Sequence, residues 1–273
     1  SVLLYRSDLL RAAVEAADEE YKFAALYDLR LRVSCEAPLV HVSEYLYTEV
    51  EHDFRKSGEK QFDYVDPRNR AVQIEMEAAC TAHLKRIGGY LKPEFEPIAF
   101  SEEAFAEEAS VIIPVRNRVR TIEDAIRSVL TQQTDFPFNI IVIDNHSTDG
   151  TTEKVAALAA QDKRIIHLIP ERDDLGIGGC WNLGVHHKRC GRFVVQLDSD
   201  DVYSDNNTLR KIVAAFYEQQ CAMVVGTYMM TNFQMEMIQP GVIDHKEWTP
   251  ENGRNNALRI NGLGAPRAFY TPL

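Results

Sequence analysis

Three short polar segments each follow an apolar run, and their residue types suit the binding of a phosphorylated ligand. Pro114–Asn117 closes the run that begins at Val111, Asp144 follows a second run, and Asp198–Asp201 follows a third. Carboxylates at D-x-D spacing supply hard oxygen ligands for Mg²⁺ or Mn²⁺. A metal held there would neutralise a diphosphate leaving group, and Asp144 would accept hydrogen bonds, for instance from the N–H of a base.

Alternating strands and helices from residue 109 onward must position these segments. Short, wholly apolar runs are typical of strands buried on both faces, and they predict strands near 111–115, 140–143, 164–169, 193–197 and 223–226. Helices are expected between them, near 121–132, 151–161, 178–190 and 206–219. This alternation predicts an α/β fold with a mainly parallel sheet and ligands at the carboxyl ends of its strands.

The first hundred residues show a different pattern of apolar residues. Helices are expected over 7–20 and 68–87, and helix and strand remain alternatives over 21–34. Residues 39–42 form a short β-type run, and the polar stretch 55–69 is expected to be a loop. We therefore expect a mostly helical N-terminal part.

Composition narrows the class of protein. Of the 273 residues, 45% are hydrophobic and 26% are charged, as in folded globular proteins. The net charge of -11 argues against a nucleic-acid-binding module. Five cysteines without C-x-x-C spacing predict reduced thiols and a cytoplasmic protein. The sequence contains no run of eighteen apolar residues, so it predicts no transmembrane segment, and its N-terminus lacks a signal-peptide pattern.

Four motifs taken together resemble the family 2 glycosyltransferases of GT-A fold. They are VIIPVRN at 111–117, IIVIDNHSTDGT at 140–151, GIGGCWNLG at 176–184 and QLDSDD at 196–201, and they stand in family order and spacing. The resemblance covers roughly residues 109–273. It implies an inverting, metal-dependent transfer of a sugar from a nucleotide-diphospho-sugar to a hydroxyl of a carbohydrate acceptor, with a UDP-sugar as the first choice of donor.

The resemblance also implies roles for single residues. Asp144 would meet the base, Asp198 would lie near the ribose and the donor sugar, and Asp200 would hold Mn²⁺ or Mg²⁺ together with Asp198. An arginine that often occurs in the third motif is replaced by Trp181, and Arg172 is a possible substitute. The residues that the resemblance predicts to bind the nucleotide-sugar are Pro114, Val115, Arg116, Asn117, Asp144, Asn145, Arg172, Asp198 and Ser199.

Plainer interpretations stand beside these roles. A D-x-D alone is usually a solvated turn, Asp149 before Gly150 is typical of an Asx turn or a helix cap, and Arg118 is interpreted as an ordinary surface residue. Zinc binding is disfavoured, because the spacing of the candidate ligands fits no standard closed site. Those candidates are Cys180, His186, His187 and Cys190.

The two ends of the chain suggest a tandem arrangement. Residues 259–270 resemble the acceptor loop of the family, and the catalytic base is expected beyond Leu273, so no catalytic residue is assigned within the chain. Residues 25–32 and 42–47 resemble segments that follow such a base. We therefore expect three parts: the end of a preceding transferase-like module (1–58), a helical linker (59–108) and a GT-A nucleotide-sugar-binding domain (109–273).

Two other functions remain open. A sugar-phosphate nucleotidylyltransferase should carry a glycine-rich phosphate loop after the first strand, and PVRNRV at 114–119 has no glycine. A non-catalytic nucleotide-sugar-binding or scaffolding module is favoured by the missing base, whereas the DSDD and VIDN segments favour retained donor binding.

Overall fold

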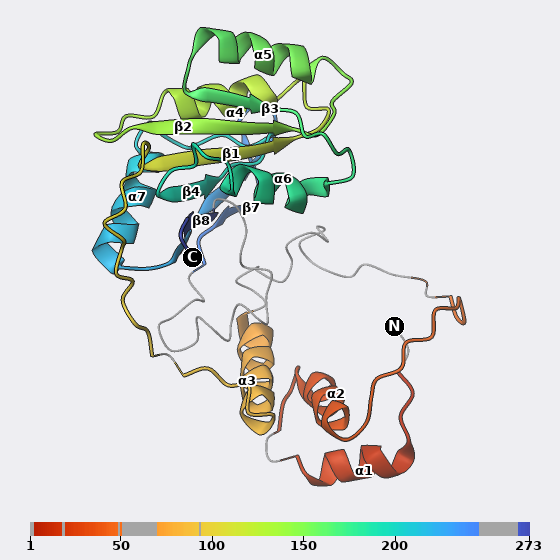
Figure 1. The fold of residues 1–273 in the computed structure, drawn as a ribbon. Helices are drawn as coiled ribbons and strands as arrows, with labels where there is room; N and C mark the ends of the chain where they lie inside the picture. Colours follow the sequence, from red (N-terminus) through yellow and green to blue (C-terminus); the bar gives the residue numbers. More distant parts are fainter. Residues whose placement is uncertain (1–2, 18–19, 49, 51–69, 93, 246–266) are drawn as a thin grey trace. The chain divides into compact units, whose positions relative to one another are not determined.

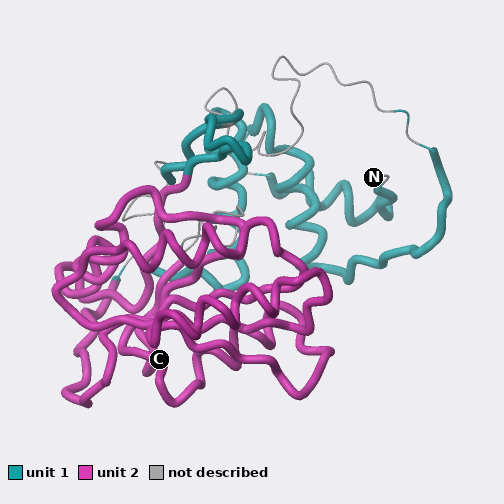
Figure 2. Tube along the Cα trace, turned by 90° about the horizontal axis from the view of Figure 1, so that it is seen from above, with its two compact units in different colours: residues 1–94, 229–262 teal, residues 95–228, 263–273 magenta. Residues whose placement is uncertain are grey.

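The structure is a computed structural model that describes all residues except 1–2, 18–19, 49, 51–69, 93 and 246–266 (Figure 1). The chain divides into two compact units (Figure 2). Unit 1 consists of residues 1–94 and 229–262, and unit 2 consists of residues 95–228 and 263–273. The division into 1–58, 59–108 and 109–273 stays a prediction.

Unit 2 is built on a six-stranded sheet with the strand order β3-β2-β1-β4-β8-β5. Strands β1 to β4 are parallel, and β8 pairs antiparallel with both β4 and β5. The predicted α/β class with a mainly parallel sheet is thereby confirmed. The strands are β1 (Ala109–Val115), β2 (Phe138–Asp144), β3 (Ile165–Leu168), β4 (Phe193–Gln196), β5 (Met223–Val225) and β8 (Arg267–Tyr270).

Helices cover both faces of this sheet, which explains why its central strands are mostly apolar. Val111, Ile113 and Val115 of β1 pack into the larger core cluster with residues of α4, α5 and α7, whereas Ile112 packs with α6 on the other face. Because side chains alternate along a strand, a strand covered on both sides needs apolar residues at every position. The helices are α4 (Ile122–Leu130), α5 (Thr151–Gln161), α6 (Gly176–Val185) and α7 (Thr208–Gln219).

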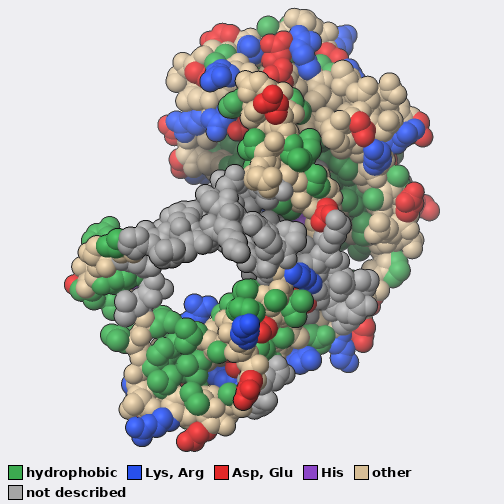
Figure 3. All heavy atoms as spheres, turned by 180° about the vertical axis from the view of Figure 1, so that it is seen from behind, with side chains coloured by type: hydrophobic (Ala, Val, Ile, Leu, Met, Phe, Trp, Pro, Cys, Tyr) green, Lys and Arg blue, Asp and Glu red, His purple; other side chains and the backbone are tan. Residues whose placement is uncertain are grey.

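Unit 1 contains three helices and a two-stranded sheet within its described residues. They are α1 (Ser7–Glu15), α2 (Ala25–Glu36), α3 (Arg70–Arg86), β6 (Tyr228–Thr231) and β7 (Met237–Ile243). The carboxylate of Asp28 is buried, and it lies 2.7 Å from Arg32 Nε and 3.6 Å from Arg86 of α3. This charge network ties α2 to α3. Hydrophobic side chains gather over α1 and α2 on the face drawn in Figure 3.

Two expectations for the N-terminal part can now be judged. The ambiguous segment 21–34 is largely helical, since it overlaps α2. The β-type run at 39–42 was wrong, because these residues form no strand, and Leu39, Val40 and Val42 are exposed. An apolar run becomes a strand only where another strand pairs with it. The predicted loop 55–69 lies outside the described residues. Among the described helices, none has the length and apolar character needed to cross a membrane.

Candidate nucleotide-sugar site

The three polar segments meet at the carboxyl edge of the parallel strands. Val115 at the end of β1 pairs with Asp144 at the end of β2, and the N–H of Asn145 extends this ladder by donating to the Val115 carbonyl at 2.8 Å. On the other side of β1, the N–H of Leu197 donates to the carbonyl of Ile112 at 3.1 Å. The sheet therefore brings the residues after β1, β2 and β4 to one edge.

Asp144 is fully buried and is engaged by its own loop. Its Oδ1 accepts a hydrogen bond from the N–H of Ser147 at 3.0 Å, and its Oδ2 accepts one from the hydroxyl of Thr152 in α5. The Nε2 atom of His167 lies 3.6 Å from the same Oδ2. A carboxylate beside the N-terminus of a helix is stabilised by nearby donors and by the helix dipole. Asp144 thus anchors the start of α5, and its direct contact with a base stays a prediction.

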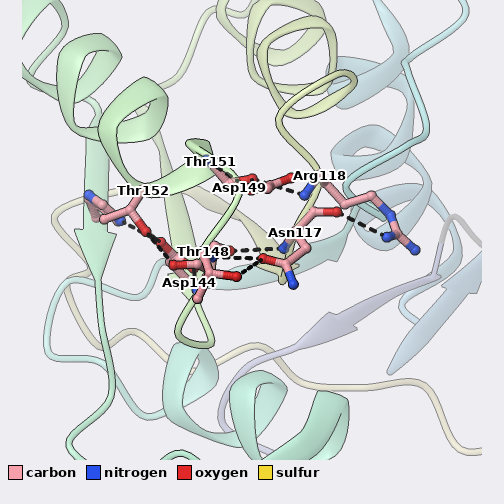
Figure 4. A network of polar contacts seen from close by, with 9 residues as sticks. Asn117, Arg118, Asp144, Thr148, Asp149, Thr151 and Thr152 are labelled. Carbon is pink, nitrogen blue, oxygen red and sulfur yellow. Dashed lines mark hydrogen bonds and ion pairs between the residues drawn. The ribbon is translucent and has the colours of Figure 1, made fainter.

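The loop after β1 is fastened to the loop after β2 by backbone-to-side-chain hydrogen bonds (Figure 4). The N–H of Asn117 donates to Ser147 Oγ at 2.9 Å, and Asn117 Oδ1 accepts from the N–H of Thr148 at 2.8 Å. The N–H of Arg118 donates to Thr151 Oγ1 at 2.9 Å. Asn117 has a φ of 55°, a left-handed conformation that asparagine tolerates better than most residues. The edge is therefore shaped by a network that spans both loops.

Asp149 completes this network with the Asx turn expected from its sequence context, while Gly150 is the N-cap residue of α5. Its Oδ2 accepts from the N–H of Val119 at 3.1 Å, and its Oδ1 accepts from the N–H of Thr151 at 3.0 Å. The hydroxyl of Thr151 also donates to it and is the main cause that lowers the pKa of Asp149. The turn before α5 is held by a carboxylate that stays ionised.

The acidic segment after β4 gathers three carboxylates. Asp198 is half-buried and accepts a hydrogen bond from Gln196 Nε2 at 3.0 Å, while Gln196 Oε1 accepts from Arg267 Nε of β8 at 2.6 Å. The side chain of Asp200 is 49% exposed. Loss of water around its carboxyl group, together with the charges of Asp198 and Asp200, raises the pKa of Asp201 to about 6. Repulsion among the three carboxylates favours the binding of a cation by this segment.

A comparison with known protein families decides the family. The profile described as "Glycosyl transferase family 2" matches residues 110–260, which is more than half of the chain. The chain belongs to glycosyl transferase family 2. The family predicted from the four motifs is therefore confirmed.

Curated relatives agree with this membership over part of their length. An uncharacterized glycosyltransferase of Rickettsia conorii is 40% identical over 34% of this chain and 15% of its own. The Escherichia coli UDP-Glc:alpha-D-GlcNAc-diphosphoundecaprenol beta-1,3-glucosyltransferase WfgD is 32% identical over 45% of this chain and 46% of its own. The chain thus spans less than half the length of either relative. Among solved structures, S. aureus TarS in complex with UDP-GlcNAc is 22% identical, with a TM-score of 0.47, over 60% of this chain and 45% of that one.

The acidic segment of this family 2 chain has the donor chemistry that a divalent metal requires. Magnesium is commonly bound by one or two carboxylates together with the phosphates of a substrate. Asp198 and Asp200 supply such carboxylates at D-x-D spacing. In the part of the chain that the structure describes, no three His, Cys, Asp or Glu residues are grouped to hold a metal without a substrate. The residues fit a metal shared between protein and diphosphate.

Arg118 was interpreted as a surface residue, and the structure gives it a place in the site. Its Nε lies 3.5 Å from Asp200 Oδ2, and both side chains are about half exposed. A guanidinium beside the predicted metal ligand can also approach a phosphate, because its planar fork matches phosphate oxygens. The signal available in the sequence was its position two residues after Arg116, directly beyond β1.

The remaining predicted residues occupy different surroundings. Pro114 and Val115 are buried in β1, so their predicted contact with the nucleotide-sugar would have to involve backbone atoms rather than side chains. Arg116 is exposed, and no hydrogen bond or ion pair engages its guanidinium within the described residues. The guanidinium of Arg172 is paired with Asp174 at 2.9 Å. Ser199 is buried.

Of the four candidate zinc ligands, Cys180 is a buried member of the smaller core cluster and Cys190 packs against that cluster. Cys180 is buried, and this burial, with the charge of Asp144, raises the pKa of its thiol. His186 Nδ1 lies 2.9 Å from the carbonyl of Asn182, and His187 Nδ1 accepts from the N–H of Arg189 at 3.2 Å. The two cysteines therefore pack in the core, and the two histidine rings contact backbone atoms.

Proposed function

We propose that this chain carries the donor site of a glycosyltransferase that moves a sugar from a nucleotide-diphospho-sugar to a hydroxyl of a carbohydrate acceptor, with inversion. The observation that carries the proposal is the convergence of the segments 114–117, 144–145 and 198–201 at one sheet edge in a family 2 chain. In an open parallel sheet this edge is the usual ligand site.

The acidic segment would hold the diphosphate end of the donor. Asp198 and Asp200 would bind Mn²⁺ or Mg²⁺, and such a metal, when bound, neutralises the charge that develops on the departing diphosphate. The hydrogen bond from Gln196 fixes Asp198, and Arg267 fixes Gln196, so one ligand is oriented before the donor arrives. Arg118, whose Nε lies 3.5 Å from Asp200 Oδ2, would bind a phosphate oxygen of the donor.

The nucleoside end would be read by Asn145. Its side chain is buried, and its Oδ1 has no hydrogen-bond partner among the described residues. A buried acceptor without a donor costs about 1–3 kcal/mol, which a ligand that donates would recover. Uracil, thymine and guanine each present an N–H next to a carbonyl, and a side-chain amide can pair with both. We therefore expect Asn145 to recognise this edge of the base without choosing among the three.

A UDP-sugar is the first donor to test. The name of WfgD includes a UDP-linked donor, and WfgD is 32% identical to this chain where the two align. A cytoplasmic location remains part of the proposal.

Titration calorimetry with UDP, GDP and dTDP, each with and without Mn²⁺, tests the donor site. We expect Mn²⁺-dependent binding of at least one nucleotide, and we expect Asp200→Ala to abolish the Mn²⁺-dependent part. Glu218→Ala is the matched control, because it also removes one exposed carboxylate, on α7. A folded chain that binds none of the nucleotides would refute the donor site. Binding without sugar transfer in the full-length protein would instead support the non-catalytic binding module.

A further inference from the structure

A second cleft lies at the opposite, amino-terminal edge of the same sheet. Its volume is about 830 Å³, which is within the usual range for ligand sites. It is lined by the segments that lead into the parallel strands: Glu107 before β1, Phe138 at the start of β2, Arg164 before β3 and Arg189 before β4. Strands β1 and β2 have seven residues each, so about 20 Å of strand separates this edge from the candidate donor site.

The charge of this cleft is opposite to that of the unit around it. Unit 2 has 14 Lys and Arg against 20 Asp and Glu, a net charge of -6. The cleft lining has four basic residues, Lys163, Arg164, Arg189 and Arg210, against the two acidic residues Glu107 and Asp135. A local excess of positive charge attracts anions even on a unit whose net charge is negative.

Two of the four basic residues are committed to the fold, and two are available. Arg164 is paired with Asp162 at 2.7 Å and stacks on the ring of Phe138, and Arg189 lies 3.6 Å from Glu107. Lys163 and Arg210 are exposed, and within the described residues no hydrogen bond or ion pair engages either side chain. The two available cations come from different elements, the α5–β3 connection and α7.

The walls between these cations are held in place. The buried side chain of Gln132 donates to the carbonyls of Ser128 and Asp205 and accepts from the N–H of Leu209 at 2.9 Å. The N–H of Gln133 donates to the carbonyl of Asn206 at 2.7 Å. These bonds fix the loop after α4 to the start of α7, which carries Arg210. A site whose walls are already ordered loses less entropy when a ligand binds.

We propose that this cleft binds a small anion carrying linked phosphoryl groups, with Lys163 and Arg210 as its main contacts. Two cations from separate elements suit a ligand with more than one anionic group, and the arginine fork suits phosphoryl oxygens. This site is separate from the donor site and needs no metal ion.

The test is calorimetric titration of the chain with inorganic diphosphate in buffer containing EDTA, which removes the metal that the donor site is proposed to need. We expect saturable binding, weakened at least tenfold in Lys163→Gln/Arg210→Gln, because a hydrogen bond to a charged group contributes more than a tenfold change in affinity. Arg127→Gln/Lys154→Gln is the matched control. It removes the same charge from α4 and α5, where both residues pair with Glu123 outside the cleft.

Each outcome has a defined meaning once circular dichroism shows that all variants are folded. Metal-free binding that is lost in the cleft variant and kept in the control supports the site, and Asp200→Ala should leave it unchanged. Equal weakening in both double variants would reduce the effect to net charge and overturn the proposal, as would the absence of binding in EDTA. Binding of UDP in EDTA at least tenfold tighter than binding of diphosphate would also overturn it, because recognition would then rest on the nucleoside.

Discussion

Replacing Gly184 by alanine tests how α6 lies against the sheet beneath the candidate donor site. A Cβ at this position would stand 2.8 Å from Ile112 Cγ2, 3.0 Å from Ile112 Cδ1 and 3.0 Å from Ile143 Cδ1. Carbon atoms in favourable contact are separated by about 3.5–4.0 Å, so all three contacts are too short. Ile112 and Ile143 are fully buried, and they lie in β1 and β2, whose ends carry the site.

The expected cost follows from a comparison within the same helix. Gly178→Ala places its Cβ where no atom lies within 4 Å, so this variant gains the helix preference of alanine without a clash. Gly184→Ala gains a similar preference and must also displace buried isoleucines. Overpacking of this kind costs about 1–3 kcal/mol. We expect Gly184→Ala to be less stable than Gly178→Ala by that amount, or by about 2–12 °C in Tm for a chain of this size.

Urea denaturation followed by circular dichroism measures this difference, with thermal unfolding as a second readout. Comparing the two alanine variants with each other removes the helix preference that they share. Equal stability of the two variants would refute the close contact between α6 and the sheet. A loss of nucleotide binding in Gly184→Ala at a temperature where it remains folded would show that the contact also positions the strand ends.

Two further predictions concern the carboxylates of the site. Because the pKa of Asp201 is raised to about 6, its carboxyl group retains a proton below that pH and loses it above. The affinity for Mn²⁺ measured by calorimetry should therefore fall between pH 7 and pH 5, and Asp201→Asn should flatten this fall. An unchanged pH profile in the variant would assign the pH dependence to another group. Thr152→Val removes the hydroxyl that donates to buried Asp144, and we expect a loss of about 1–3 kcal/mol in the free energy of unfolding measured by urea denaturation. The control is Thr131→Val at an exposed position, where the hydroxyl donates to the carbonyl of Ser128, and equal effects of the two substitutions would contradict the anchoring role of Asp144.

Much of unit 2 could be predicted because its signals are local. An apolar run such as 140–143 reports a strand covered on both faces, and the chain between such runs has the length of one helix. The position of β8 between β4 and β5 carried no such signal, since Arg267–Tyr270 is short and joins the sheet from the far end of the chain. Antiparallel insertion of a strand between two others depends on pairing partners that are distant in sequence. The strand prediction at 39–42 was wrong for a related reason: the run is apolar but pairs with no other strand.

The site shows where reasoning from residue types reaches its limit. Asp144 and Asn145 follow the same strand, and residue type alone favours the carboxylate as the group that meets a base. Burial changes this ranking, because an ionised carboxylate without water needs donors nearby. Ser147 and Thr152 are those donors, so part of the acceptor capacity of Asp144 is used within the fold, and its contact with a base stays a prediction. Asn145 carries no charge, so its buried Oδ1 can stay without a donor among the described residues at a smaller cost, which is why we propose this oxygen as an acceptor for a ligand.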